Sequence, residues 1–196
     1  DKKKISLKDL ERAYEHNSRN IKTILLLANL HKYMLKYQQA LKYYKKLYQY
    51  YPGNFRLAAN IAEIHFLLDH REAMERYLKQ AIYTKGGQPK VVHKHTPKTA
   101  QALYFLQQGE LDSAEDKFKA LLRKNYKNLA AHYGLYQVYK RQNKTQKRNQ
   151  TMFTSALIFS KSSIHWQAER LLRELRQKKP DSEKYLYHQA LFYEAQ

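Results

Sequence analysis

Apolar side chains recur at helical spacing along most of the chain, and helix-breaking residues separate the recurrences. The segment Leu27-Ala28-x-x-His31 is matched by Ile61-Ala62-x-x-His65 at a spacing of about 34 residues. The positions that follow keep this spacing, so that Ala40, Tyr44, Leu47 and Pro52 correspond to Met74, Leu78, Ala81 and Gly86. Each block therefore predicts two amphipathic helices joined by a short turn.

Two further blocks continue the pattern after an insertion of about six residues around Gly86-Gly87-Gln88-Pro89. The third block has a turn at Gly109, and its apolar positions are Ala102, Phe105, Ala114, Phe118 and Leu121. The fourth block returns to the original spacing, with Leu135, Tyr136, Tyr139, Arg148, Met152 and Ser155 at the matching positions. Four blocks in register predict a stack of helical hairpins.

The two ends of the chain match the period less completely. A fifth block starts near Ser163, but Leu171, Leu172 and Leu175 are out of step with the earlier blocks, and its second helix is expected around Leu186, Gln189 and Ala190. The segment Leu7–His16 is expected to be the second helix of an incomplete repeat. Its start is marked by a capping box of Ser6 with Asp9 and a hydrophobic staple of Ile5 with Leu10. We therefore expect the chain to begin inside a longer stack.

This arrangement resembles the tetratricopeptide repeat, whose period is about 34 residues, and the resemblance covers nearly the whole chain. It implies an all-α, right-handed α-solenoid of antiparallel helix pairs, in which small residues such as Ala28 let two helices approach and large ones such as Tyr44 fill the space against the next pair. It also implies a single domain over residues 1–196. The expected units are a half-repeat at about 5–18, repeats at about 21–54, 55–88, 95–128 and 129–162, and a degenerate repeat at 163–196.

The resemblance places a concave groove along the first helix of each pair. Members that grip the carboxyl end of a peptide use two asparagines and three basic residues there. Asn29 and Asn60 occupy the two asparagine positions, but Leu25, Thr96 and Ala100 occupy the basic ones. Peptide binding is thus expected without specificity for a terminal carboxylate, unless the two asparagines are only solvated helix residues. The candidate groove residues are Asn29, Asn60, Lys22, Lys32, Arg56, Tyr133 and Gln137.

The charge points to an acidic partner. With 37 Lys and Arg residues against 17 Asp and Glu residues, the net charge is +20, and it is spread along the chain. The basic and aromatic stretch from Lys42 to Tyr51 divides at helical spacing into a buried aromatic stripe and a solvated basic face. A second basic cluster brackets a turn and is the better candidate for binding a polyanion: Lys140, Arg141, Lys144, Lys147 and Arg148.

Catalytic, cofactor and metal chemistry have no signature here. The chain has no cysteine, and His93-Lys94-His95 lacks neighbouring ligands that would complete a metal site. His31 and His65 stand where the family usually has an aromatic packing residue, so we interpret them as structural. No motif for catalysis or phosphate binding is present. We therefore expect neither an enzyme nor a bound cofactor or metal.

The sequence leaves two main classes of function open, beside a third in which the chain is a regulatory or targeting region of a larger enzyme. The first is a scaffold or adaptor, or a subunit of a larger assembly, that binds a peptide or an acidic protein through its groove. The second is a polyanion-binding module for RNA or another nucleic acid, or for an anionic glycan, for example in a bacterial envelope or polymer-export system. The longest apolar run, around Ile24–Leu27, is too short to cross a membrane. The compartment is open between the cytoplasm and, if a signal peptide has been removed, the periplasm.

Overall fold

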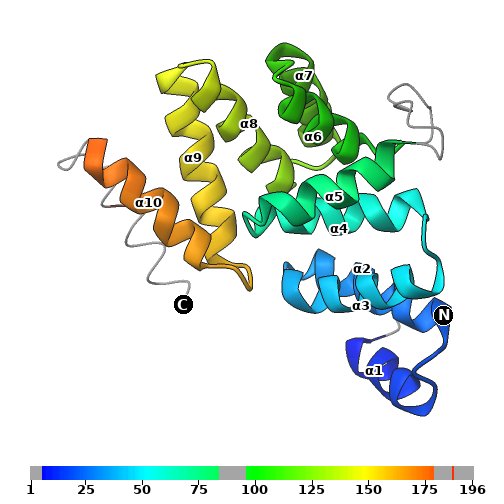
Figure 1. Cartoon of the computed structure of the whole chain (residues 1–196). Coiled ribbons are helices and arrows are strands. Elements are labelled where there is room, and N and C mark those ends of the chain that lie inside the picture. Colours follow the sequence, from blue (N-terminus) through cyan, green and yellow to red (C-terminus); the bar gives the residue numbers. More distant parts are fainter. Residues whose placement is uncertain (1–5, 84–95, 179–186, 188–196) are drawn as a thin grey trace.

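The computed structural model describes residues 6–83, 96–178 and 187, and the described part of the chain is all-α (Figure 1). Its helices are α1 (Leu7–His16), α2 (Ile21–Tyr33), α3 (Tyr37–Tyr50), α4 (Phe55–Leu67), α5 (Arg71–Ile82), α6 (Lys98–Gln108), α7 (Leu111–Lys124), α8 (Leu129–Arg141), α9 (Thr145–Ser160) and α10 (Trp166–Lys178). The pairs α2–α3, α4–α5, α6–α7 and α8–α9 pack as hairpins, and α10 packs on α9. This confirms the predicted tetratricopeptide-like stack of helix pairs.

Helix α1 has the bounds expected for the second helix of an incomplete repeat. The predicted capping box is present, because the backbone N–H of Asp9 donates to Ser6 Oγ at 3.2 Å and the backbone N–H of Ser6 donates to Asp9 Oδ2 at 3.1 Å. Helix α10 begins at Trp166, three residues after the expected start of the fifth block near Ser163. Four of the predicted features lie outside the described residues. They are Ile5 of the predicted staple, the insertion at 86–89, the histidines at 93 and 95, and, apart from Tyr187, the expected helix around 186–190.

The turn inside each hairpin is the same in all four pairs. Its central residue has a positive φ, 59° at Leu35, 58° at Asp69, 80° at Gly109 and 56° at Asn143. The next residue donates its N–H to the carbonyl five positions earlier, as in Lys36 to His31 at 2.8 Å and Lys144 to Tyr139 at 3.0 Å. This is the Schellman pattern, which satisfies carbonyls at the end of the first helix.

The connections between hairpins also repeat. Asparagine caps the start of α2, α4 and α8, where a side-chain oxygen accepts a backbone N–H from the first turn. These bonds run from Thr23 to Asn20 at 3.1 Å, from Leu57 to Asn54 at 3.2 Å and from Ala131 to Asn128 at 3.0 Å. Such caps stabilise a helix start by about 1 kcal/mol each. Helix α6 follows the insertion and begins at Lys98, and its N-cap residue Pro97 provides no side-chain hydrogen bond.

The core forms where small residues face large ones. Ala28, Ala62 and Ala102 are fully buried, and Tyr44, Leu78 and Phe118 are buried beside them, as the repeat predicts. At the interface between α7 and α8 the small residue is Gly134. A Cβ added there would lie 2.3 Å from the ring of Phe118, so only glycine fits this contact.

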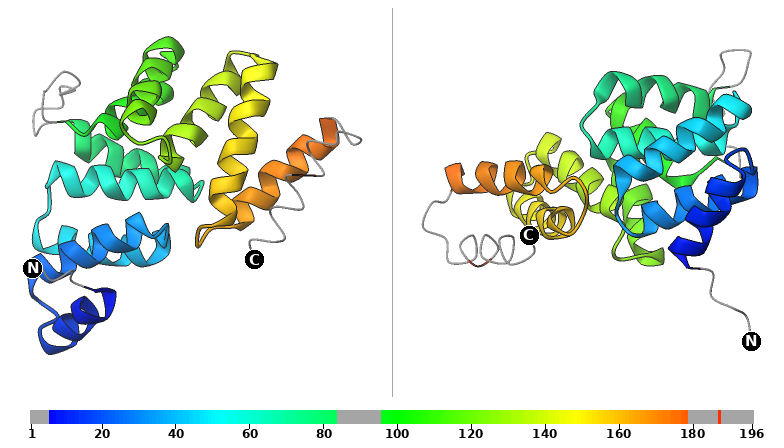
Figure 2. Two further views of the ribbon diagram at one scale, coloured as in Figure 1. Left: turned by 180° about the vertical axis from the view of Figure 1, so that it is seen from behind. Right: turned by 90° about the horizontal axis from the view of Figure 1, so that it is seen from below.

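The stack curls until its last described helix reaches the first hairpins (Figures 1 and 2). Ser163, in the loop between α9 and α10, donates its backbone N–H to the carbonyl of Leu35 at 3.1 Å, and its hydroxyl oxygen accepts the backbone N–H of Tyr37 at 2.9 Å. Gln167 Nε2 donates to the carbonyl of Leu67 at 3.0 Å. Arg170 of α10 also pairs with Asp69 in the turn after α4. Ser163, Gln167 and Arg170 thus hold the curled end of the described stack against the first two hairpins.

Candidate interaction surfaces

One face of α2 carries large apolar side chains that remain exposed. Lys22, Leu25, Leu26, Asn29 and Tyr33 recur every three or four residues and so share one side of the helix, which we call the α2 face. Tyr33 has 85% of its surface exposed, and both leucines belong to the exposed large hydrophobic residues. Because α2 packs on α1 and α3 and has no backbone approach to α4, this face is not covered by the described part of the chain.

A hydrogen-bonded cluster links the end of α2 to α4. Lys32 Nζ lies 2.8 Å from both Asn60 Oδ1 and Glu63 Oε2, and Asn60 Nδ2 donates to the carbonyl of Arg56 at 3.0 Å. Glu63 is a buried carboxylate, so the ammonium of Lys32 offsets its desolvation. Four predicted groove residues therefore lie around this α2–α4 cluster: Asn29, Lys32, Arg56 and Asn60.

Asn29 is held by a tyrosine from the paired helix. The Tyr44 hydroxyl donates to Asn29 Oδ1 at 2.7 Å. Burial, with the charge of Glu63 in support, raises the pKa of Tyr44, so its hydroxyl keeps the proton that it donates. This bond uses the oxygen of the Asn29 amide and orients its NH₂ group, which makes no hydrogen bond to the described residues. The amide of an exposed asparagine so placed can donate to a peptide carbonyl.

The two predicted groove residues on α8 lie elsewhere. Tyr133 has only 1% of its surface exposed, because its ring packs on Phe66 at 5.0 Å and on Phe159 at 5.4 Å between centroids. Its hydroxyl accepts a hydrogen bond from Arg170 at 2.6 Å. Tyr133 is thus a core residue of the curl and cannot touch a partner in this arrangement. Gln137 instead lines a pocket that the sequence did not indicate.

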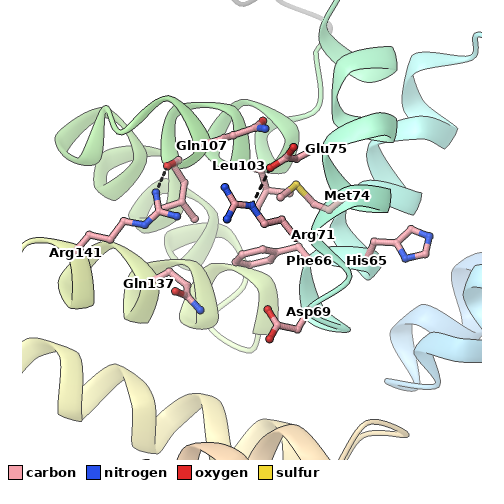
Figure 3. A pocket seen from close by; sticks show the side chains of 11 residues that line it. His65, Phe66, Asp69, Arg71, Met74, Glu75, Leu103, Gln107, Gln137 and Arg141 are labelled. Carbon is pink, nitrogen blue, oxygen red and sulfur yellow. Dashed lines mark hydrogen bonds and ion pairs between the residues drawn. The ribbon is translucent and has the colours of Figure 1, made fainter.

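This pocket, the junction pocket, lies where the α4–α5 hairpin meets α6 and α8 and has a volume of about 480 Å³ (Figure 3). The sequence explains its position. The spacing between equivalent residues is 34 everywhere except from His65 to Phe105, where the insertion makes it 40. The two halves of the stack meet at this break in the period, and residues 84–95 themselves are not described. The residues that line the pocket are His65, Phe66, Asp69, Arg71, Met74, Glu75, Leu103, Leu106, Gln107, Gln137 and Arg141.

The predicted basic cluster at the α8–α9 turn is partly neutralised by acids from other helices. Lys140 Nζ lies 3.4 Å from Glu174 of α10, and Lys144 Nζ lies 3.5 Å from Glu115 of α7. Arg141 donates to the carbonyl of Leu106 at 2.6 Å. The sequence alone shows little opposing acid near these bases, because both glutamates are distant along the chain.

Glu115 is a buried carboxylate with several donors. Burial acts to raise its pKa, but hydrogen bonds from Lys119 and Tyr139 and the charges of Lys119 and Lys144 outweigh burial and lower the pKa. The carboxylate therefore stays ionised and holds two lysines. Of the five predicted polyanion contacts, Arg141, Lys147 and Arg148 have no carboxylate partner in the described residues, and Lys147 Nζ lies 5.7 Å from the ring centre of Tyr139.

The two histidines at equivalent positions pack as aromatic residues. His31 stacks on Tyr43 with centroids 5.5 Å apart and planes at 11°, and His65 stacks on Tyr77 at 5.8 Å and 12°. Both are buried, and burial lowers the pKa of each. Across residues 6–83 and 96–178, acidic residues, histidines and cysteines do not gather in groups that could hold a metal ion. The same part of the chain contains no helix that is long and apolar enough to cross a membrane.

Comparison with known proteins finds similar solved structures only. No protein-family model and no curated protein sequence matches the chain. PilW, a widely conserved type IV pilus biogenesis factor, is 14% identical with a TM-score of 0.46, over 92% of this chain and 87% of that one. YrrB, a TPR protein with an unusual peptide-binding site, is 10% identical with a TM-score of 0.39, over 92% and 97%. MamA is 14% identical with a TM-score of 0.36, over 86% and 96%.

Proposed function

We propose that this chain is a protein-interaction scaffold that binds an extended segment of an acidic partner protein along the α2 face. The observation that carries the proposal is the exposed row of Leu25, Leu26, Asn29 and Tyr33 on one side of the helix. Single exposed apolar residues are ordinary, but a contiguous row of them on a helix is typical of an interaction surface. Tyrosine is also enriched at such surfaces.

The polar groups along this face fit a peptide backbone between apolar side chains. The Asn29 amide is oriented by Tyr44 at 2.7 Å and has donors to spare. A segment that lies along α2 would place its own apolar side chains on Leu26 and Tyr33 and a carbonyl against Asn29. Leu25, where carboxylate-gripping members of the family have a base, extends the apolar surface and favours an internal segment of the partner over its carboxyl end.

Charge supports an acidic partner. Lys22 and Arg56 are exposed and have no ion pair within the described residues, whereas the neighbouring Lys32 is already paired with Glu63 at 2.8 Å. With a net charge of +20, the whole molecule would also accelerate the approach of an acidic partner at low salt.

Selection from a phage-displayed random peptide library on the wild-type protein tests this proposal. We expect selected peptides to combine acidic with large apolar residues. In fluorescence anisotropy, Tyr33→Ala should weaken the best peptide by about tenfold or more, as expected for a central aromatic contact. Tyr126→Ala is the matched control, because Tyr126 is 72% exposed but lies in the loop between α7 and α8. Equal losses for both variants, or no selected peptide, would overturn the proposal.

The alternative is a polyanion-binding module that acts through the basic cluster at the α8–α9 turn. Its support is the net charge together with Lys147 and Arg148, which have no carboxylate partner in the described residues. Labelled poly-U separates the two functions. Polyanion binding through this cluster should fall with salt at a log–log slope of about −0.7 for each phosphate neutralised. It should be weaker and less dependent on salt in Lys147→Gln but unchanged in Tyr33→Ala.

A further inference from the structure

The junction pocket is a hollow of ligand size that the function proposed above does not use. Its volume of about 480 Å³ falls inside the range of roughly 300–1,000 Å³ that is usual for ligand sites. Helices α4, α5, α6 and α8 supply its walls, whereas the α2 face lies on a helix that does not contribute to it. A ligand of the pocket therefore binds independently of the α2 face.

The lining of the pocket combines apolar and polar side chains. Phe66, Leu103 and Leu106 are buried residues of this lining, and Met74 is partly buried. Gln107 and Gln137 contribute amide side chains to the same lining. An amide side chain both donates and accepts, so this pair matches the backbone of a polypeptide better than it matches a purely apolar ligand.

One arginine that lines the pocket has no ion pair with a described residue. Arg71 Nε pairs with Glu75 Oε1 at 3.0 Å, and Asp69 pairs with Arg170 of α10. Both carboxylates of the pocket are therefore neutralised, but Arg141 has no carboxylate partner in the described residues. Figure 3 shows the side chains of Arg71 and Arg141 extending from α5 and α8 toward the space beside Phe66.

Arg141 is also held in position. Its Nη1 donates at 2.6 Å to the carbonyl of Leu106 near the end of α6, which also accepts the backbone N–H of Gly109 at 3.4 Å. A guanidinium has five N–H donors, so this bond leaves the other edge of the fork available. A cation that is already oriented loses little freedom when it binds a carboxylate.

We propose that the junction pocket binds an acidic side chain that neighbours a large apolar side chain in a partner polypeptide. The carboxylate pairs with Arg141, the apolar side chain covers Phe66 and Met74, and the backbone between them meets Gln107 and Gln137. An internal acidic and apolar residue pair supplies both a carboxylate for Arg141 and an apolar side chain for the cavity beside Phe66 and Met74, and neither group alone supplies both.

Capped dipeptides test this assignment on the wild-type protein. The probes are acetyl-Glu-Phe-amide, acetyl-Gln-Phe-amide without the carboxylate, and acetyl-Glu-Gly-amide without the apolar side chain. The chain has three methionines, so methyl-¹³C labelling gives one pocket signal from Met74 and two internal controls, the exposed Met34 and the fully buried Met152.

We expect acetyl-Glu-Phe-amide to shift the Met74 methyl signal saturably, with Kd on the order of 1 mM for so small a ligand. The Met34 and Met152 signals should stay in place. Each of the other two probes should bind about tenfold more weakly or not at all. No saturable shift of Met74, or equal affinity for the Glu and Gln probes, would overturn the proposal, and neither result requires a variant to fold.

Arg141→Gln locates the carboxylate. It should weaken acetyl-Glu-Phe-amide about tenfold while leaving acetyl-Gln-Phe-amide unchanged, because only the first probe carries the charge that Arg141 pairs with. Arg173→Gln is the matched control, since Arg173 is an exposed arginine of α10 that does not line the pocket. An unchanged Met152 signal shows that a variant is folded. If both variants bind the Glu probe like the wild type, Arg141 is not the contact and the proposal fails.

Discussion

At the scale of single residues, one cluster of three rings recurs in consecutive repeats. In each copy a histidine of the first helix stacks on a tyrosine of the second, and that tyrosine meets the edge of another tyrosine from the preceding second helix, at 5.5 Å in the first copy and 5.6 Å in the next. The copies are Tyr14, His31 and Tyr43, then Tyr48, His65 and Tyr77. Every member lies one full repeat period from its counterpart, which supports α1 as part of an incomplete repeat.

The buried imidazole of His65 makes stability depend on pH. Burial first, and then the nearby Lys45, His70 and Arg76, lower the pKa of His65 from 6.5 to about 4. Between these values the unfolded chain binds a proton that the folded chain does not, so the contribution of His65 is present above pH 6.5 and is lost as the pH falls toward 4. Lowering the pH from 7 to 5 should cost about 2 kcal/mol of unfolding free energy through this residue.

Replacement by phenylalanine tests this cause. His65→Phe keeps a ring on Tyr77 and removes Nε2, which has no hydrogen-bond partner in the described residues, together with Nδ1, which lies 3.3 Å from Nδ1 of His70. Urea unfolding at pH 7 and pH 5 should show a pH-dependent loss about 2 kcal/mol smaller than in the wild type. His16→Phe, at the exposed end of α1, serves as the control and should keep the full loss. A variant at position 65 that keeps the wild-type pH dependence would contradict this account.

At the scale of elements, the residue with a positive φ in each hairpin turn affects the free energy of unfolding. Gly109 has φ of 80°, and a Cβ added there would meet no atom within 4 Å. Gly109→Ala should therefore lose about 1 kcal/mol of unfolding free energy from backbone conformation alone. Asn143→Gly, at the equivalent turn, should change stability by less than about 0.5 kcal/mol, because asparagine tolerates this conformation. Urea unfolding measures both, and an alanine variant as stable as the wild type would show that the turn is not under this constraint.

The helices and their hairpin turns were largely predictable because short stretches of sequence determine them. The regular repeat spacing predicts the hairpins, and Gly109 predicts its own turn. Leu35 does not, because leucine rarely adopts a positive φ and the Schellman hydrogen bonds hold it there, and Asp69 is a weaker turn signal than glycine because aspartate adopts this conformation only occasionally. The α2–α4 cluster gathers residues predicted from the resemblance, such as Asn29 and Asn60. The acids that pair with the lysines of the α8–α9 turn could not be foreseen, because they arrive from other helices.

At the scale of the whole molecule, the repeat spacing predicts that neighbouring hairpins stack, but it does not predict how far the stack curls. The angle between neighbouring hairpins accumulates over several repeats, so the spacing within one repeat does not determine the final curl. Two of the contacts that close the curl, from Ser163 and Gln167, end on the backbone carbonyls of Leu35 and Leu67. A carbonyl is present at every residue, so sequence carries no mark of these contacts. This is why the sequence predicts Tyr133 in a groove while the structure places it in the core.

The contact between the two ends can be measured at one amide. Tyr37 is the first residue of α3, so its N–H has no partner within that helix, and the N–H donates to Ser163 Oγ at 2.9 Å. In Ser163→Ala the N–H loses this acceptor, and we expect hydrogen exchange at Tyr37, followed by NMR, to accelerate about tenfold or more. Ser160→Ala is the matched control, because that buried hydroxyl donates only to the carbonyl of Leu157 within α9. A Tyr37 amide that exchanges freely in the wild type would mean that the loop at Ser163 does not contact the first hairpin in solution.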